Sequence, residues 1–286
     1  MKYEIHRQYE PQQVALAESA FLTVWSGLGS WHEDLVLIGG LVPKYLCGDV
    51  GTTRVLPRPV TLDADLGIAL GTSHGQYGSL QMDLQAQGFR LSKDEFGGPR
   101  FVKTIGDFTI PVDFLAESPP ATKGAVVVDD VPANILPGVN RALATARRVA
   151  VRGLDLFNAP QNLTIRVCEV GPFLAMKLRA FASRQQPKDA FDLLYTLRYY
   201  DRGTENAIAA FAEEVRAGNP ACPDAIGCLN QHFRDEQSPA PIKAAHFIFG
   251  PVVPDESADI RLKRRQIQQD MVDAGRLLRA AVPTSS

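Results

Sequence analysis

Three aspartates interrupt apolar stretches of this sequence. Asp63 and Asp65 lie two residues apart in TLDADLGIAL, and Asp113 lies within FTIPVDFL. Alternate residues of a strand point to the same face, so the first two carboxylates are expected side by side. Neighbouring carboxylates repel one another and are costly to bury, and a divalent metal ion such as Mg²⁺ removes that cost. The alternative is that Asp63 and Asp65 are two solvated acids at the end of a strand.

Asp113 joins the other two aspartates only if its strand lies beside theirs. A single acid in a strand is usually a feature of an edge or a turn. Three carboxylates near one point need strong compensation, which metal ions supply. The sequence therefore predicts a metal site that combines two separate strands.

A pair of glycines, Gly39 and Gly40, follows the apolar run LVLI, which predicts a buried strand. Glycine lets the backbone bend sharply and approach a ligand closely. Residues 48–59 are rich in Gly, Thr and Pro and contain Arg54 and Arg58. We expect this segment to form a loop that reaches toward the carboxylates.

The composition is that of an ordinary globular protein, with 286 residues, 45% hydrophobic and 22% charged. This length allows one large domain or two. The net charge of −2 gives no general attraction to nucleic acid, so an RNA site needs a local basic patch. The scattered cysteines favour reduced thiols, and neither a signal-peptide core nor a membrane-spanning run is evident. We therefore expect a cytoplasmic protein.

The periodicity predicts an α+β chain. Residues 1–155 are expected to form a mixed-sheet domain, and residues 156–286 a mostly helical domain with a ligand cleft between the two. The expected helices cover 11–27, 74–87, 169–184, 188–199 and 255–282, and the expected strands 35–38, 62–70, 89–91, 101–105, 108–115, 147–152 and 164–167. The last helix carries a basic run that would meet RNA phosphates or form a solvated face: Arg261, Lys263, Arg264 and Arg265.

The segment FLAMKLRAFASRQQPKDAFDLLYTL combines charged and apolar residues at helical spacing. Lys177 and Arg184 lie seven residues apart, hence on one face of a helix. Asp189 and Asp192 are three apart and also face one way. In one interpretation Lys177 binds phosphate as a point charge, and Asp192 orients Lys177 or Arg184 or arranges an acceptor. In the other, Lys188 and the two acids form a solvated first turn.

These motifs together resemble known families. GG, TLDADL and VDF resemble the signature of the nucleotidyltransferase fold of the polymerase-beta-like superfamily. The later segment resembles the Lys-x-x-Ala, Arg, Lys-Asp, Asp-Leu block of the AbiEii/AbiGii nucleotidyltransferase toxin family. Two departures are visible. Leu41 and Val42 follow the glycines where the family often has Ser or Thr, and Arg58 lies five residues before Asp63, where the family tends to place an Arg four before.

The resemblance implies a nucleotidyltransferase-fold domain and transfer of a nucleoside monophosphate from a nucleoside triphosphate to an acceptor hydroxyl. It implies that Asp63, Asp65 and Asp113 are catalytic and hold two Mg²⁺ ions, with Mn²⁺ as an alternative. The nucleotide-binding residues that it implies are Gly39, Gly40, Arg58, Thr61, Lys177, Arg184, Lys188 and Asp192. It further implies a toxin that acts on RNA, such as the 3′ end of tRNA, and that has a cognate antitoxin protein.

Two other functions remain open from the sequence. One is a nucleotidyltransferase for small molecules of the aminoglycoside type, which a deep acidic acceptor pocket would favour. The other is a nucleotidyltransferase-like fold that binds nucleotides without catalysis, which the residues after Gly40 would permit. A basic groove beside the carboxylates would favour RNA.

Overall fold

A computed structural model describes residues 3–48, 55–69, 79–128 and 130–282. Arg54 and the part of the expected helix at 74–78 lie outside the described residues. The chain divides into two compact units. The sheet unit contains Glu10–Val42 and Val60–Glu169, and the helical unit contains Lys2–Tyr9, Pro43–Pro59 and Val170–Ser286.

The sheet unit is built on one mixed sheet of nine strands among the described residues. Its strand order is β3-β4-β5-β2-β1-β9-β8, with β7 pairing β5 and β6 outside this path. The pairs β2–β5 and β1–β9 are parallel, and β1–β2 and β4–β5 are antiparallel. The strands are β1 Leu35–Ile38, β2 Ala64–Ile68, β3 Arg90–Lys93, β4 Pro99–Ile105, β5 Phe108–Ala116, β6 Ala125–Val128, β7 Val131–Ile135, β8 Arg147–Leu154 and β9 Pro160–Val167.

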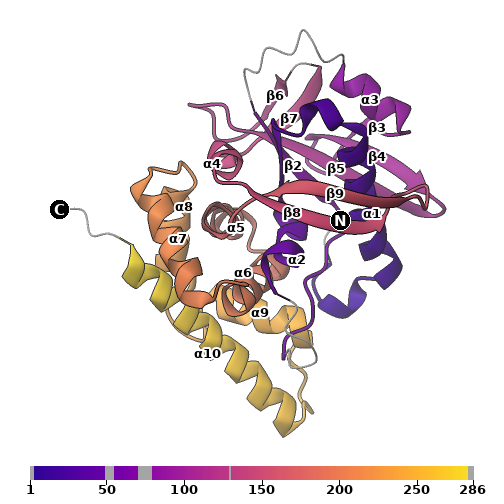
Figure 1. Ribbon diagram of the computed structural model, residues 1–286. Helices are drawn as coiled ribbons and strands as arrows, with labels where there is room; N and C mark the ends of the chain where they lie inside the picture. The colour runs from indigo at the N-terminus through magenta and orange to yellow at the C-terminus, as the bar shows by residue number, and fades with distance from the viewer. Residues whose placement is uncertain (1–2, 49–54, 70–78, 129, 283–286) are drawn as a thin grey trace. The chain divides into compact units, whose positions relative to one another are not determined.

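Helix α1, Pro11–Gly27, covers part of this sheet and contacts β2, β5, β8 and β9 (Figure 1). It begins at a proline, whose missing N–H would have no partner in the first helical turn anyway. Phe21, Leu22 and Trp25 are buried on it, and the Trp25 indole donates a hydrogen bond to the Thr164 carbonyl. The shorter helical segments of the unit are η2 Gly29–Trp31, η3 Gly39–Leu41, α3 Leu80–Ala86 and α4 Val139–Ala144.

Among the described residues, the helical unit packs the six helices after residue 169 around an aromatic core. Helix α5 contacts α6, α7 and α8, while α9 packs against α6 and α10. The buried rings include Phe173, Phe181, Phe191, Tyr195, Phe211, Phe233 and Phe247. The helices are α5 Val170–Arg184, α6 Pro187–Tyr199, α7 Thr204–Arg216, α8 Cys222–His232, α9 Pro239–Phe249 and α10 Ala258–Ala281.

Two earlier segments of the chain belong to this unit. The short helix η1, His6–Gln8, contacts α9, and α2, Val42–Leu46, begins at the end of the sheet unit. The His6 Nε2 donates to the Arg58 carbonyl at 2.9 Å. The Tyr199 hydroxyl accepts bonds from the backbone N–H groups of Val55 and Leu56 at 3.1 and 3.3 Å. Hydrogen bonds thus fix the main chain around Arg58 within the helical unit.

The structure confirms the α+β class and the helix predicted over 11–27. It corrects the strand predicted over 62–70, which is limited to Ala64–Ile68, so that Asp63 precedes the strand. Helices α7, α8 and α9 were not predicted individually. The sheet unit includes β9 and extends to Glu169, whereas the predicted domain boundary was at 155. Among the described residues, no helix has both the length and the apolar character needed to span a membrane.

Candidate active site

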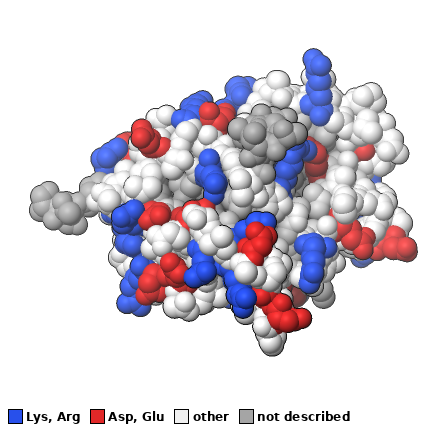
Figure 2. Space-filling view, turned by 90° about the horizontal axis from the view of Figure 1, so that it is seen from below, with Lys and Arg blue, Asp and Glu red and all other residues white. Residues whose placement is uncertain are grey.

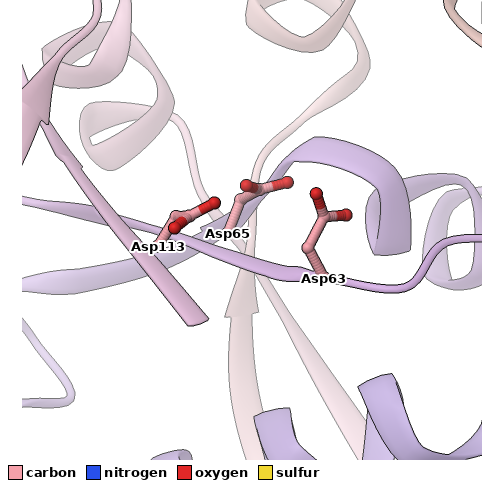
Figure 3. A group of neighbouring side chains, drawn as sticks. All are labelled: Asp63, Asp65 and Asp113. Atoms are coloured by element: carbon pink, nitrogen blue, oxygen red, sulfur yellow. The ribbon is translucent and has the colours of Figure 1, made fainter. Parts of the chain in front are cut away.

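The parallel pairing of β2 and β5 brings the three predicted aspartates together. Asp65 and Asp113 are direct neighbours in the register of these strands, and Asp63 lies just before β2. One carboxylate oxygen from each residue lies within 4.8 Å of the other two. Figure 3 shows the three carboxylates on one side of the strands, with Asp65 between Asp113 and Asp63. We call these three residues the acidic cluster.

The strand pattern explains this placement. The residues that flank the acids, Ala64, Leu66, Val112 and Phe114, are all buried. Since successive side chains of a strand point to opposite faces, burial of these neighbours turns the carboxylates to the other face. The apolar core thereby fixes the direction in which the acids point.

The glycine turn makes room for the acidic cluster. Gly39 directly follows β1, whose Ile38 pairs with Asp65, and it adopts a φ of +73°. A Cβ at this position would lie 1.8 Å from the Oδ2 of Asp65. Only glycine therefore leaves the space that this carboxylate occupies. Thr61, also a predicted site residue, donates a hydrogen bond from its hydroxyl to the Oδ1 of Asp63.

The sequence reasoning missed a cation in this site. Arg100 on β4 donates from Nε to the Oδ1 of Asp113 at 3.0 Å and from Nη2 to its Oδ2 at 2.5 Å. The β4–β5 hairpin could have revealed this residue. Its strands pair from Ile105 and Phe108 at the turn to Phe101 and Val112, and the next pair in the same register is Arg100 and Asp113. Burial disfavours the charged guanidinium, but the bond to Asp113 and the charges of Asp113, Asp63 and Asp65 outweigh it and raise the pKa of Arg100.

The acidic cluster suits a divalent metal ion. Two ligand oxygens on opposite sides of an octahedral Mg²⁺ lie about 4.2 Å apart, which small side-chain movements would reach from the present spacing. Three carboxylates face one guanidinium, so these four side chains carry excess negative charge. Carboxylate oxygens are also the donors that Mg²⁺ and Mn²⁺ prefer. The residues present therefore fit such an ion.

The helical unit holds a second cluster of charges, at the junction of α5 and α6. The Asp192 Oδ2 accepts from the Nζ of Lys177 at 2.8 Å and of Lys188 at 2.6 Å. Asp189 accepts from Arg184 through Nε at 2.6 Å and Nη2 at 2.8 Å, and from Lys177 at 3.1 Å. We call these five residues the basic network. Their three cations exceed their two carboxylates, which favours an added anion.

Most of the basic network is buried, which overturns the interpretation of Lys188, Asp189 and Asp192 as a solvated turn. The side chains of Asp189 and Asp192 are 1% and 0% exposed. Burial opposes the charge of Lys177, but the charges of Asp192 and Asp189 outweigh it and raise the pKa of Lys177. Asp192 Oδ1 and the Thr196 hydroxyl are buried without a hydrogen-bond partner among the described residues. Such atoms are costly unless a water or a ligand bonds them.

The predicted site residues therefore fall into two groups. The sheet unit contains Gly39, Gly40, Thr61 and the acidic cluster, while the helical unit contains Arg58 and the basic network. The structure brings together the three aspartates with Gly39 and Thr61, and separately Lys177, Arg184, Lys188 and Asp192.

The basic run at the start of α10 is less uniform than the sequence suggested. Arg264 is buried and donates to Glu256 at 2.5 Å and to the Gly250 carbonyl at 3.0 Å. Lys263 pairs with Asp259 on the exposed side of the helix. Basic and acidic side chains are interspersed on the face in Figure 2. Of the four basic residues, only Arg261, Lys263 and Arg265 are solvent-exposed.

Comparison with known proteins identifies a family. Residues 124–276, more than half of the 286-residue chain, match the family described as nucleotidyl transferase AbiEii toxin of type IV toxin–antitoxin systems. No curated protein matches the chain. One similar solved structure is the solution structure of the antibiotic-resistance factor ANT(2'')-Ia, at 15% identity and a TM-score of 0.35, covering 73% of this chain and 96% of that one.

Proposed function

The chain belongs to the AbiEii family of nucleotidyl transferase toxins, and we propose that it transfers a nucleoside monophosphate from a nucleoside triphosphate to an acceptor hydroxyl in a metal-dependent reaction. The observation that carries this proposal is the acidic cluster, whose three carboxylates lie within 4.8 Å of one another. Their apolar neighbours and Gly39 hold them in place. Carboxylates this close repel one another and destabilise the folded protein unless a cationic ligand binds them.

The roles follow from the positions of the side chains. Asp63 and Asp65 would hold two Mg²⁺ ions, and Asp113 would hold one of them and accept the proton of the acceptor hydroxyl. When bound, Mg²⁺ neutralises the triphosphate and activates the acceptor oxygen. Gly39 and Gly40 would let backbone N–H groups approach the phosphates, and Thr61 would position Asp63 through its hydroxyl bond.

For the basic network we propose phosphate binding. Its excess of cations suits a triphosphate, since charge-assisted bonds to phosphate are strong. Lys177 and Lys188 share Asp192, which places two ammonium groups close together where they could bond one phosphate. Arg184 is 41% exposed at its side chain and is therefore the member most open to a ligand. We include Arg58 because of its place in the family-like sequence.

For the acceptor we propose RNA, with the 3′ end of tRNA as the specific candidate, and for the partner a cognate antitoxin protein. The type IV toxin–antitoxin description of the family supports the antitoxin partner. The RNA acceptor rests on the resemblance of the sequence motifs to this family. The proposed setting is the cytoplasm. An aminoglycoside-type acceptor is the rival that the same acidic cluster would also serve, and nucleotide binding without transfer is the second rival.

The test is a transfer assay with defined arms. The purified protein is incubated with each α-³²P-labelled nucleoside triphosphate and total RNA, with Mg²⁺ or with EDTA. We expect wild type to label RNA in Mg²⁺ but not in EDTA, and Asp65→Asn to give no label in either. The control is Asp107→Asn, which changes an exposed acid in the β4–β5 turn and should label RNA as fully as wild type. Label on an added aminoglycoside and not on RNA would support the first rival. Nucleotide binding without pyrophosphate release would support the second.

A further inference from the structure

Arg100 binds one member of the acidic cluster, and the sequence patterns did not predict it there. It lies on β4 opposite Asp113 on β5, and its guanidinium donates to both oxygens of that carboxylate. The two side chains are 18% and 13% exposed, so the pair is mostly shielded from water. A fork of this kind holds a carboxylate in one orientation and neutralises one of its charges.

The other two acids also act on Arg100. The charges of Asp63 and Asp65, together with that of Asp113, favour its charged form. A guanidinium stays protonated at any ordinary pH, so its positive charge is permanent. Arg100 therefore supplies to the acidic cluster part of the positive charge that a metal ion would bring.

We propose that Arg100 is the resident counter-ion of the acidic cluster and competes with a divalent metal ion for Asp113. This inference rests on the metal dependence of the proposed function. A dication and a guanidinium a few ångströms apart repel each other, and Asp113 satisfies Arg100 through both of its oxygens. Arg100 thus stabilises the folded protein when no metal is bound. It also lowers the affinity of the acidic cluster for metal below the affinity that the cluster would have without Arg100.

A purely orienting role predicts the opposite result. Hydrogen bonds to a ligating carboxylate commonly hold it in position, and their loss weakens the metal site. If Arg100 only aimed Asp113, its removal would lower the affinity for metal. Competition predicts higher affinity. The sign of the change therefore separates the two roles.

The chain offers a matched control for this experiment. Arg147 on β8 donates to Glu169 through Nε at 2.7 Å and Nη2 at 3.2 Å, and the side chains are 14% and 18% exposed. This pair has similar geometry and burial to Arg100–Asp113. It lies at the other end of the strand order from β4 and β5. Arg147→Gln therefore removes a comparable ion pair away from the acids.

The measurement is titration of the full chain with Mn²⁺ alone, followed by the loss of the free-ion signal in electron paramagnetic resonance. We expect Arg100→Gln to bind Mn²⁺ about tenfold more tightly than wild type, and Arg147→Gln to bind like wild type. In EDTA, Arg100→Gln should melt at a lower temperature than wild type, and Mn²⁺ should raise its Tm by more. Unchanged or weaker Mn²⁺ binding by folded Arg100→Gln would overturn the proposal.

A second variant keeps the test decisive if Arg100→Gln does not fold. Arg100→Lys retains the charge but cannot hold both oxygens in a planar fork. We expect Arg100→Lys to bind Mn²⁺ more tightly than wild type but less tightly than Arg100→Gln. An affinity equal to or below wild type would contradict competition. If wild type does not bind Mn²⁺, the metal dependence in the proposed function is contradicted. If wild type binds Mn²⁺ and the Arg100 variants bind it with the same affinity, only the proposed role of Arg100 is contradicted.

Discussion

The acidic cluster and the basic network each gather buried or partly buried charges, but their imbalance has opposite sign. The acidic cluster sets three carboxylates against Arg100. The basic network sets three cations against Asp189 and Asp192. The first accordingly favours a cationic ligand and the second an anionic one. A metal ion is such a cation and a triphosphate is such an anion. Metal binding therefore tests the acidic cluster, and triphosphate binding tests the basic network.

The comparison also predicts what a lost acid does to stability. An acid removed from a group with excess negative charge relieves repulsion. An acid removed from a buried group with excess positive charge leaves cations uncompensated, which is strongly destabilising. Asp65→Asn in the acidic cluster and Asp192→Asn in the basic network should therefore have opposite effects on folding.

The largest expected effect is on activity in the acidic cluster. Asp65→Ala should lower nucleotidyl transfer by about 10³-fold or more, because several kcal/mol of transition-state stabilisation depend on the metal site. If the chain acts as a toxin, cells that express wild type should grow slowly and cells that express Asp65→Ala normally. Growth curves at matched protein levels check this. Equal growth of both strains would count against the toxin function and leave transfer itself open.

The next largest effect is on stability in the basic network. Asp192→Asn should lower the free energy of unfolding by about 3–5 kcal/mol, because Lys177 and Lys188 lose a shared and fully buried partner. Denaturant unfolding followed by circular dichroism measures the change. Asp259→Asn, which breaks the exposed pair with Lys263, is the control and should cost about 0.5 kcal/mol or less. If both variants lost the same free energy of unfolding, Asp192 would not be needed to balance the charges of Lys177 and Lys188, and the prediction would be wrong.

A smaller effect is expected on nucleotide affinity. Lys177→Ala should weaken triphosphate binding by about 1.5–3 kcal/mol through loss of a charge-assisted bond to phosphate. Because Lys177 is buried and holds both acids, this variant should also melt at a lower temperature. Calorimetric titration with nucleotide, at a temperature where the variant is folded, separates the two effects. Unchanged affinity would remove Lys177 from the nucleotide site.

Local sequence patterns were sufficient to predict that the three aspartates lie together, but not that Arg100 binds one of them. Asp63 and Asp65 form a two-residue spacing, and Asp113 stands out inside an apolar strand. Arg100 meets Asp113 only through the register of the β4–β5 hairpin, and no spacing within one strand reveals that register. Gly39 was predicted to approach a ligand, and the structure adds that it makes room for Asp65.

The helical unit illustrates a second limit. The contacts of Lys177 with Asp189 and Asp192 join residues 12 and 15 apart on two helices, which single-helix periodicity cannot reveal. Helices α8 and α9 were not predicted, and each has a proline in its first turn. A proline among small and polar residues suggests a loop, although it is well suited to the first turn of a helix.

The central claim, that Asp63, Asp65 and Asp113 share a metal site, is tested most directly by thermal melts of wild type and Asp65→Asn. Each protein is measured with EDTA and with Mg²⁺ plus nucleoside triphosphate. Asparagine keeps the shape and removes one repelling charge, so the variant should be as stable as wild type in EDTA or up to about 1 kcal/mol more stable. Wild type should gain stability with Mg²⁺ and triphosphate, since a ligand that binds only the native state raises the Tm, and Asp65→Asn should lose this gain together with transfer. A variant that keeps the full Mg²⁺-dependent shift and still transfers nucleotide would contradict the shared metal site.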